Sequence, residues 1–283
     1  MVTRDYLTLV EALGIPRGSI VALVGGGGKT STLFRMVRES SRDGCRVLAT
    51  TTARMKMEEI VEVRDVLLWD ERDASGETWK SHRSHTAESG WIDKVLEGEG
   101  AEPRIPAAFL GRQVMRDKLI GLPTDYLGDL LSRLTWDMVY VEADGSRGRS
   151  VKGHRIGEPI IPLCATHCVV VVGADGLDCA VNEETCHRPE IVQEVLGLDW
   201  GEHLTPGRVA QLLGDRRGLL PKIPGDMEVS VYVNKTPLGG EHEPSRNFAE
   251  EVLANCGSRI HRVAVGDNLQ GGLVETFSLE STS

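Results

Sequence analysis

The sequence predicts an α/β fold in which a mostly parallel, doubly wound sheet carries helices on both faces. Short apolar runs recur along the chain, and helical patterns lie between several of them. The runs are nearly continuous and rich in valine, which is typical of strands covered on both faces. Strands that alternate with helices favour parallel crossovers. The predicted strands are residues 19–24, 46–50, 65–69, 138–142, 168–172, 229–233 and 260–265.

Two of the intervening segments carry clear helix signals. Residues 30–40 place apolar side chains on one side, and Gly44 follows as a helix stop. Residues 205–213 begin with Thr205 as an N-cap and Pro206 at the first helical position. We therefore expect a helix over each segment.

Residues 70–125 interrupt this alternation. The stretch contains a long polar part without a clear period. It predicts either an inserted, lid-like excursion from the sheet or a solvated surface loop. We expect the 283 residues to form a single α/β domain, 1–283, into which this segment is inserted.

Charge and hydropathy restrict the partners of the chain. A formal net charge of -10 argues against general nucleic-acid binding, although local backbone dipoles can still hold a small anion. No apolar run approaches the ~18 residues of a membrane span, and the N-terminus lacks a signal-peptide core. We therefore expect a cytoplasmic protein with no membrane partner. The six cysteines form no C-x-x-C pair and are expected to be reduced and buried.

A glycine run in SIVALVGGGGKTSTLFRM, residues 19–36, follows a predicted strand and precedes a predicted helix. Leu23 breaks the usual phosphate-loop pattern G-x-x-x-x-G-K-[ST], but a shortened G-x-x-G-K-T fits residues 25–30. Glycines let backbone amides turn toward a phosphate, while the helix N-terminus and Lys29 add positive charge. The alternative is a tight turn without a ligand. We predict a nucleotide site of P-loop type, formed by Gly25, Gly26, Gly27, Gly28, Lys29, Thr30 and Ser31.

The predicted strand 138–142 runs into two acids, Glu142 and Asp144, which lie on the same side of an extended chain. One acid would hold Mg²⁺ together with the Thr30 hydroxyl, and the other would orient an attacking water. The sequence leaves open which acid has which role. Three basic residues follow closely and are candidates to stabilise charge on the terminal phosphoryl group: Arg147, Arg149 and Lys152.

Two other strand ends are candidates to line the nucleotide. Thr51 and Thr52 end one of them, where their hydroxyls either approach the Mg²⁺ shell or simply suit a strand end. Asn234 and Lys235 begin an N-K-x-D pattern, which many GTPases use to read guanine, but Pro237 replaces the aspartate. The expected nucleotide is therefore ATP or GTP.

As a set, these motifs resemble the YqeC family. Along the chain they are VGGGGKTS, VLATTTARM, KLIGLPTDYLGDLL, VYVEADGSRGRSVKG, EPIIP, HRPE, LTPGRVAQLL and VNKT. The likeness spans nearly the whole chain, and the combination is far more specific than any one motif. That family is described as an accessory or cofactor-biosynthesis protein of selenium-dependent molybdenum hydroxylases.

The resemblance implies a nucleotide loop over residues 25–30 with Thr51 and Thr52 beside it. It also implies that the site includes Glu142, Asp144, Lys152, Glu158, His187 and Arg188. We expect catalytic roles for Lys29, Glu142, Asp144 and Lys152, and substrate contacts for Arg147, Glu158, His187 and Arg188. The chain departs from the family pattern at Gly157, where relatives tend to have histidine before Glu-Pro. His154 would substitute for that histidine, or the role is dispensable.

The residues and the resemblance together predict a Mg²⁺-dependent P-loop NTPase. It would use ATP or GTP in the maturation of a selenium-dependent molybdenum hydroxylase, with the hydroxylase or its cofactor or selenium carrier as partner. One alternative is a kinase or nucleotidyltransferase acting on a selenium or molybdopterin species. Another is a non-catalytic, nucleotide-gated delivery protein. The paired acids favour an enzyme.

Overall fold

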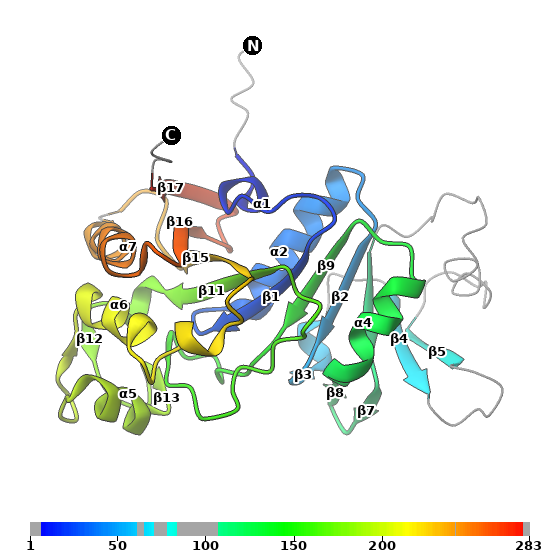
Figure 1. Ribbon diagram of the computed structural model, residues 1–283, viewed down its shortest axis with the longest axis horizontal. Helices are drawn as coiled ribbons and strands as arrows, with labels where there is room; N and C mark the ends of the chain where they lie inside the picture. Colours follow the sequence, from blue (N-terminus) through cyan, green and yellow to red (C-terminus); the bar gives the residue numbers. More distant parts are fainter. Residues whose placement is uncertain (1–6, 61–64, 71–77, 84–106, 241, 280–283) are drawn as a thin grey trace, which may run out of the picture.

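The computed structural model describes residues 7–60, 65–70, 78–83, 107–240 and 242–279. Its central feature is a sheet of ten strands (Figure 1). The strands are β1 (Ile20–Gly25), β2 (Val47–Thr51), β4 (Asp65–Asp70), β5 (Thr78–Arg83), β6 (Ala107–Gly111), β9 (Met138–Glu142), β11 (His167–Gly173), β15 (Glu228–Asn234), β16 (Ile260–Asp267) and β17 (Gly272–Ser278).

Across the sheet the strands lie in the order β17-β16-β15-β11-β1-β9-β2-β6-β4-β5. Every pair from β16 to β4 is parallel, and only the outermost pairs, β16–β17 and β4–β5, are antiparallel. The strand that leads into the glycine loop, β1, lies between β11 and β9 in the interior of the sheet. The carboxyl ends of these parallel strands therefore meet around the loop.

Helices cover both faces of the sheet, as the sequence predicts. The helices are α1 (Leu9–Ala12), α2 (Lys29–Arg42), α4 (Thr124–Arg133), α5 (Pro189–Leu196), α6 (Pro206–Gly214) and α7 (Glu243–Cys256). Apolar side chains of α1 and α2 pack on one face, and those of α4 to α7 pack on the other. The doubly wound, mostly parallel α/β class is thus confirmed.

The strands are apolar throughout because both of their faces are covered. Along β1, Val21 and Leu23 join the core beneath α2, while Ala22 and Val24 join the opposite core. All six residues of this strand are buried. Full burial of such a side chain contributes about 1.5–3 kcal/mol, so the two cores hold the loop end of β1 firmly.

Three small sheets flank the main one. They contain β3 (Arg54–Lys56) with β8 (Lys118–Ile120) and β7 (Gln113–Met115), β10 (Val151–Lys152) with β13 (Cys186–His187), and β12 (Cys179–Ala180) with β14 (His203–Leu204). Short 3-10 turns cover Met57–Glu59, Ala174–Gly176 and Leu220–Lys222. The β10–β13 pair lies next to the candidate site and forms part of its frame.

The segment 70–125 differs in part from its expected excursion. Residues 107–111 form β6, a strand that is buried along most of its length between β2 and β4 in the main sheet. This apolar run has only five residues and follows a long polar stretch, which is why its pattern is weak in the sequence. Residues 71–77 and 84–106 lie outside the described residues, so the single-domain assignment stays a prediction. Within the described part of the chain, no helix combines the length and apolarity that a membrane span requires.

Candidate functional site

The glycine run joins β1 to α2 with almost no room for side chains. Gly25, Gly27 and Gly28 have φ values of 99°, 69° and 100°, which favour glycine. A Cβ atom on Gly27 would lie 2.1 Å from the backbone nitrogen of Gly173, and one on Gly26 would lie 2.7 Å from the carbonyl oxygen of Arg149. Neighbouring backbone therefore forces this run to be glycine.

The amides of the run divide into two groups. Gly25 donates its N–H to Asp144 Oδ2 at 3.1 Å, Gly26 to the carbonyl of Val171 and Gly27 to the carbonyl of Arg149. These three amides face protein acceptors, which differs from our expectation that the whole run lines an anion. The reason is the close packing of the loop between the ends of neighbouring segments.

The second group of amides lies at the start of α2. Among the described residues, the N–H groups of Gly28, Lys29, Thr30 and Ser31 have no hydrogen-bond acceptor. Gly28 is the N-cap and supplies no side chain to satisfy them. The free amides and the positive end of the helix dipole make this turn attractive to a phosphate. Only the amides from Gly28 to Ser31 are therefore free to line an anion, which is a shorter stretch than predicted.

The Lys29 side chain folds back over the loop. Its Nζ donates to the Gly25 carbonyl at 2.7 Å and lies 3.0 Å from Asp144 Oδ1. The side chain is only 1% exposed. A buried ammonium group at the mouth of the cradle adds a full positive charge to the partial charges of the amides.

Asp144 is the centre of a buried cluster of charges. Its Oδ2 lies 2.8 Å from Lys152 Nζ and 3.0 Å from His154 Nε2. Burial by itself would raise the pKa of Asp144, but Lys29, His154 and Lys152 together hold it well below its ordinary value. Asp144 is therefore ionised at neutral pH and positions Lys29, Lys152 and His154, whose own pKa is lowered by burial.

Glu142 has a different environment. The Thr30 hydroxyl donates to Glu142 Oε2 at 2.8 Å. Burial raises the pKa of Glu142 to about 7, and Lys29 and the Thr30 hydrogen bond oppose this rise while Asp144 adds to it. A hydroxyl and a carboxylate side by side are oxygen ligands of the kind that Mg²⁺ prefers.

These two groups fit a magnesium site that is completed by a bound nucleotide. No three His, Cys, Asp or Glu side chains converge on one point in the described residues. Mg²⁺ commonly takes one or two protein ligands and completes its shell with water and phosphate oxygens. The Thr30–Glu142 pair meets that requirement without a protein cage.

The threonines after β2 support the frame of the site. Thr51 Oγ1 donates to the carbonyl of Glu142 at 2.8 Å, and Thr52 donates its N–H to the same carbonyl at 3.0 Å. The Thr52 hydroxyl donates to the carbonyl of Ile160. Their hydroxyls thus bind backbone in this structure, and the interpretation as residues that suit a strand end describes these contacts better than a metal shell.

Asn234 and Lys235 end β15 on the other side of the loop. Asn234 Nδ2 donates to the Gly27 carbonyl at 2.7 Å, and Asn234 Oδ1 accepts from the N–H of Asn268 at 3.0 Å. Lys235 Nζ donates to Asp175 Oδ2 at 2.8 Å and to Ser150 Oγ at 3.0 Å. Asn234 therefore fastens the glycine loop to the sheet.

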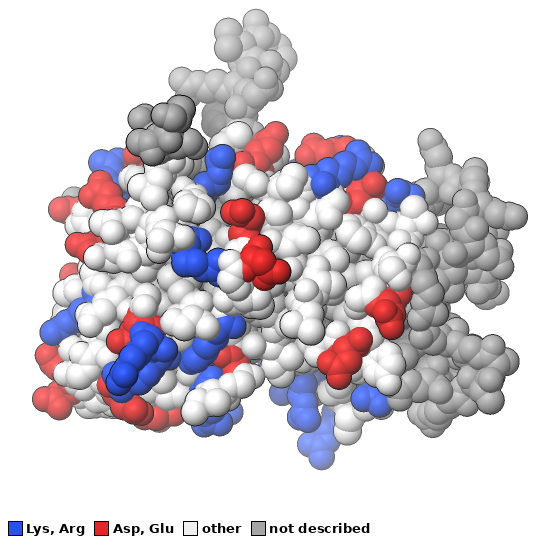
Figure 2. Space-filling model, in the orientation of Figure 1, with Lys and Arg blue, Asp and Glu red and all other residues white. Residues whose placement is uncertain are grey.

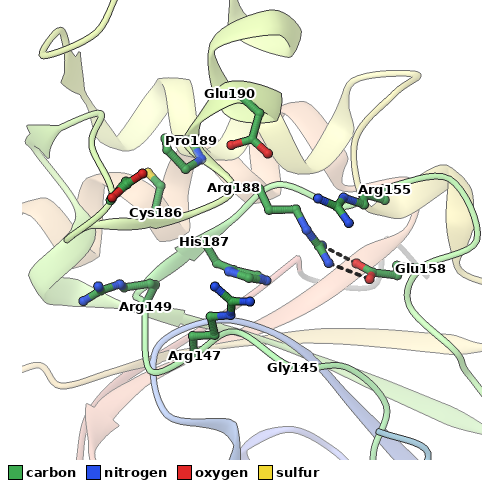
Figure 3. A pocket seen from close by; sticks show the side chains of 11 residues that line it. Gly145, Arg147, Arg149, Arg155, Glu158, Cys186, His187, Arg188, Pro189 and Glu190 are labelled. Carbon is green, nitrogen blue, oxygen red and sulfur yellow. Dashed lines mark hydrogen bonds and ion pairs between the residues drawn. The ribbon is translucent and has the colours of Figure 1, made fainter.

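A cavity of about 520 Å³ opens beside the loop that follows β9 (Figure 3). All four residues predicted to contact a substrate line it: Arg147, Glu158, His187 and Arg188. We call this cavity the arginine pocket; its other lining residues are Gly145, Arg149, Arg155, Glu183, Cys186, Pro189 and Glu190. Burial, together with Arg188, Lys152 and Arg147, lowers the pKa of His187 to about 4, so its imidazole is neutral at physiological pH.

Comparison with known proteins identifies the family. The YqeC protein family matches residues 21–190, which include the glycine loop, both acids and much of the arginine pocket. The chain belongs to the YqeC family. The YqeC protein of Escherichia coli (strain K12) is 27% identical to it over 236 residues, which cover 82% of each chain.

A more distant likeness comes from solved structures. The crystal structure of the 54 kDa signal recognition particle protein from Aeropyrum pernix K1, in complex with GDP, is 19% identical and has a TM-score of 0.38. The match covers 92% of this YqeC chain but only 43% of the other protein.

In this YqeC chain the predicted residues gather into two adjoining groups. One surrounds the start of α2 and contains Lys29, Thr30, Glu142, Asp144 and Lys152, and the other is the arginine pocket. His154 joins the first group through its contact with Asp144, and its role as a substitute histidine stays a prediction. Sequence reasoning missed Ser150, Asp175 and Asn268, whose only signal is their position next to predicted strand ends.

Cys186 lies in a setting that favours the protonated thiol. The residue is buried, and its burial raises the pKa of the thiol to about 11. The neighbouring His187 and Arg188 are half-buried in the arginine pocket. The burial of Cys186 agrees with our expectation for the cysteines, and His187 and Arg188 are the neighbours that line the pocket beside it.

Proposed function

We propose that this protein binds Mg²⁺-ATP or Mg²⁺-GTP at the start of α2 and hydrolyses it during the maturation of selenium-dependent molybdenum hydroxylases. One observation carries the proposal. Four consecutive amides without acceptors among the described residues, Gly28 to Ser31, begin the helix that also carries the buried Lys29 ammonium group and the Thr30 hydroxyl bonded to Glu142. The pathway rests on the family resemblance.

The anion-binding groups would act together on the terminal phosphates. The amides at the start of α2 would donate to phosphate oxygens, as free amides at helix N-termini do. Lys29 would turn from the Gly25 carbonyl toward the phosphates, leaving Lys152 to balance the charge of Asp144 and His154 to hydrogen-bond it. The cluster around Asp144 thus allows Lys29 to move without stranding a buried carboxylate.

The two acids would have separate roles because their environments differ. Asp144 is held by two lysines and by a hydrogen bond to His154, and it is a weak proton acceptor, so it would position Lys29 and Lys152. Glu142, with a pKa of about 7, would ionise as Mg²⁺ arrives and hold the metal shell together with Thr30. Bound Mg²⁺ would neutralise charge on the terminal phosphates.

A second candidate function is transfer of a phosphoryl or nucleotidyl group to a small acceptor. The arginine pocket favours it, because a pocket with four arginines lies directly beside the proposed nucleotide site. Hydrolysis alone needs no such pocket. Transfer predicts a labelled product other than free phosphate and slow hydrolysis when the acceptor is absent.

The proposal is tested by thermal shift of the full chain with ATP, GTP and CTP, each with and without Mg²⁺. A ligand that binds only the folded state raises the melting temperature according to its affinity. We expect a Mg²⁺-dependent rise with ATP or GTP that Lys29→Ala abolishes. The matched control is Lys118→Ala, which removes an exposed lysine of β8 and should leave the rise intact. Equal nucleotide affinity in Lys29→Ala and the parent would refute the assignment.

A further inference from the structure

The arginine pocket is framed by paired backbone. One wall is the segment from Gly145 to Glu158, and the other runs from Glu183 through β13 into α5. The parallel pairing of β10 with β13 joins the two walls, and the N–H of Gly153 donates to the His187 carbonyl at 2.9 Å. The pocket is thus a built part of the fold.

The pocket has more cationic side chains than carboxylates. Arg188 pairs with Glu158 through two hydrogen bonds, of which Nη2 to Oε1 measures 2.7 Å (Figure 3). Three further guanidinium groups, those of Arg147, Arg149 and Arg155, have no hydrogen-bond or ion-pair partner among the described residues. Guanidinium groups bind phosphate oxygens through paired N–H donors.

One arginine of the pocket, Arg188, is held in place before any ligand arrives. Arg147 and Arg188 have φ values of 51° and 62°, a region that side chains rarely adopt. Arg188 Nη1 also donates to the Gly153 carbonyl at 3.3 Å, so its guanidinium is held at both ends. The cost of ordering the Arg188 side chain therefore falls on folding, which favours binding of a ligand.

The pocket shares one wall with the glycine loop. The Arg149 carbonyl accepts the N–H of Gly27 at 2.8 Å. A line of ion pairs also connects the two sites, from Asp144 to Lys152 at 2.8 Å and from Lys152 to Glu158 at 3.6 Å. A ligand in the pocket would thus lie close to the terminal phosphates of a nucleotide on α2.

We infer that the arginine pocket binds a small molecule carrying a phosphate or diphosphate group, separate from the nucleotide at the start of α2. Binding by the pocket stands on its own residues. Only its role as the site of a second substrate rests on the proposed function.

The test measures binding of inorganic pyrophosphate by titration calorimetry at low ionic strength, because salt screens exposed charges. The Lys29→Ala chain is used first, since it disables the proposed nucleotide cradle and leaves the pocket. We expect this chain to bind pyrophosphate, and the added change Arg147→Gln with Arg155→Gln to weaken binding by about tenfold or more. Inorganic phosphate and acetate, as further titrants, distinguish a multiply charged oxyanion from any carboxylate.

The matched control is Arg54→Gln with Arg216→Gln, which removes two exposed arginines outside the pocket and gives the same change in net charge. Equal weakening by this pair would show a general charge effect and overturn the inference. Loss of pyrophosphate binding in Lys29→Ala, with no effect of the pocket arginines, would also overturn it while leaving the nucleotide proposal intact. Displacement of pyrophosphate by saturating ATP would show one shared site, against the inference.

His187 provides a local readout of occupancy. Neighbouring cations help to keep its imidazole neutral, so a bound anion should raise its pKa from about 4. NMR titration of the histidine ring protons, with and without pyrophosphate, measures this shift directly. A pKa of His187 that does not change under saturating pyrophosphate would place the anion elsewhere.

Discussion

The hydroxyl of Thr30 donates to the carboxylate of Glu142 across 2.8 Å and so joins the first turn of α2 to the end of β9. The bond connects a residue of the anion cradle to a carboxyl group whose pKa is about 7. Because the hydroxyl stabilises the charged form of Glu142, occupancy of the cradle and ionisation of this acid are coupled. The first two predictions test this coupling.

Thr30→Val removes the hydroxyl and keeps the shape of the side chain. We expect loss of most of the Mg²⁺-dependent part of nucleotide binding and a stability cost of about 1 kcal/mol from the lost hydrogen bond. Thr30→Ser is the matched control, because it keeps the hydroxyl. Urea unfolding measures the stability, and nucleotide titration with and without Mg²⁺ measures the binding. Identical Mg²⁺ dependence in the Val and Ser variants would contradict the prediction.

Glu142→Gln should remove a specific pH dependence. Burial raises the pKa of Glu142 from its ordinary value of 4.5 to about 7, so the folded state holds a proton that the unfolded state releases. The parent should therefore lose stability relative to the Gln variant as pH rises from about 4.5 to about 7, and change little above that range. Urea unfolding of both proteins across this range measures the difference. A constant difference in the free energy of unfolding would show that Glu142 titrates normally.

Mg²⁺ binding should depend on pH over the same range as stability, but in the opposite direction. Mg²⁺ needs the ionised carboxylate, so Mg²⁺-nucleotide affinity in the parent should increase as pH rises through about 7. Calorimetric titrations on either side of that pH measure this change. Glu142→Gln should bind weakly at both pH values.

Gly27→Ala tests the close approach of backbone to the loop. A Cβ atom there would lie 2.1 Å from the nitrogen of Gly173. Gly44→Ala is a matched control, because Gly44 also has a positive φ, 77°, but nothing within 4 Å of a Cβ atom. The control should cost about 1–2 kcal/mol from its left-handed backbone alone. Gly27→Ala should cost more than this and should also abolish nucleotide binding; equal unfolding free energies would contradict the packing argument.

Asn234→Ala should loosen the glycine loop. It removes the donor to the Gly27 carbonyl and the acceptor for the Asn268 amide, both of them buried contacts. Leaving buried polar groups unsatisfied costs about 1–3 kcal/mol per group. Asn255→Ala, which removes an exposed asparagine of α7, is the control. Equal shifts of the melting temperature in the two variants would show that Asn234 does not hold the loop.

The sequence was sufficient to predict seven of the ten strands of the main sheet, because strands buried on both faces read as apolar runs. It also predicted the helix after the glycine run and the helix capped by Thr205, whose hydroxyl accepts from the Arg208 amide. It did not predict β6, whose short run follows a polar stretch, or the contacts of Ser150 and Asp175. Such contacts depend on which strand ends become neighbours, and the local sequence pattern does not indicate this.

The same lack of information about neighbouring segments explains why we expected all amides of the glycine run to face an anion. The pattern of glycines indicates a loop that backbone approaches closely, but it does not say whether the approaching group is a ligand or the protein itself. In the structure, three amides of the run donate to acceptors on Val171, Arg149 and Asp144. The amides at the start of α2 have no acceptor among the described residues. Which amides meet a protein acceptor depends on the strand order, which places β11 beside β1.

Asn268 gives the carboxyl-terminal part of the chain a role in the loop. Its Nδ2 donates to the hydroxyls of Ser31 and Thr32 at 3.1 and 2.9 Å, immediately after the last parallel strand. A fragment cut at residue 190, where the family match ends, would contain every glycine of the run and yet lack this clamp. Such a truncated chain would also expose an open strand edge along β11. The grip on the helix start thus depends on a residue from the distal third of the polypeptide.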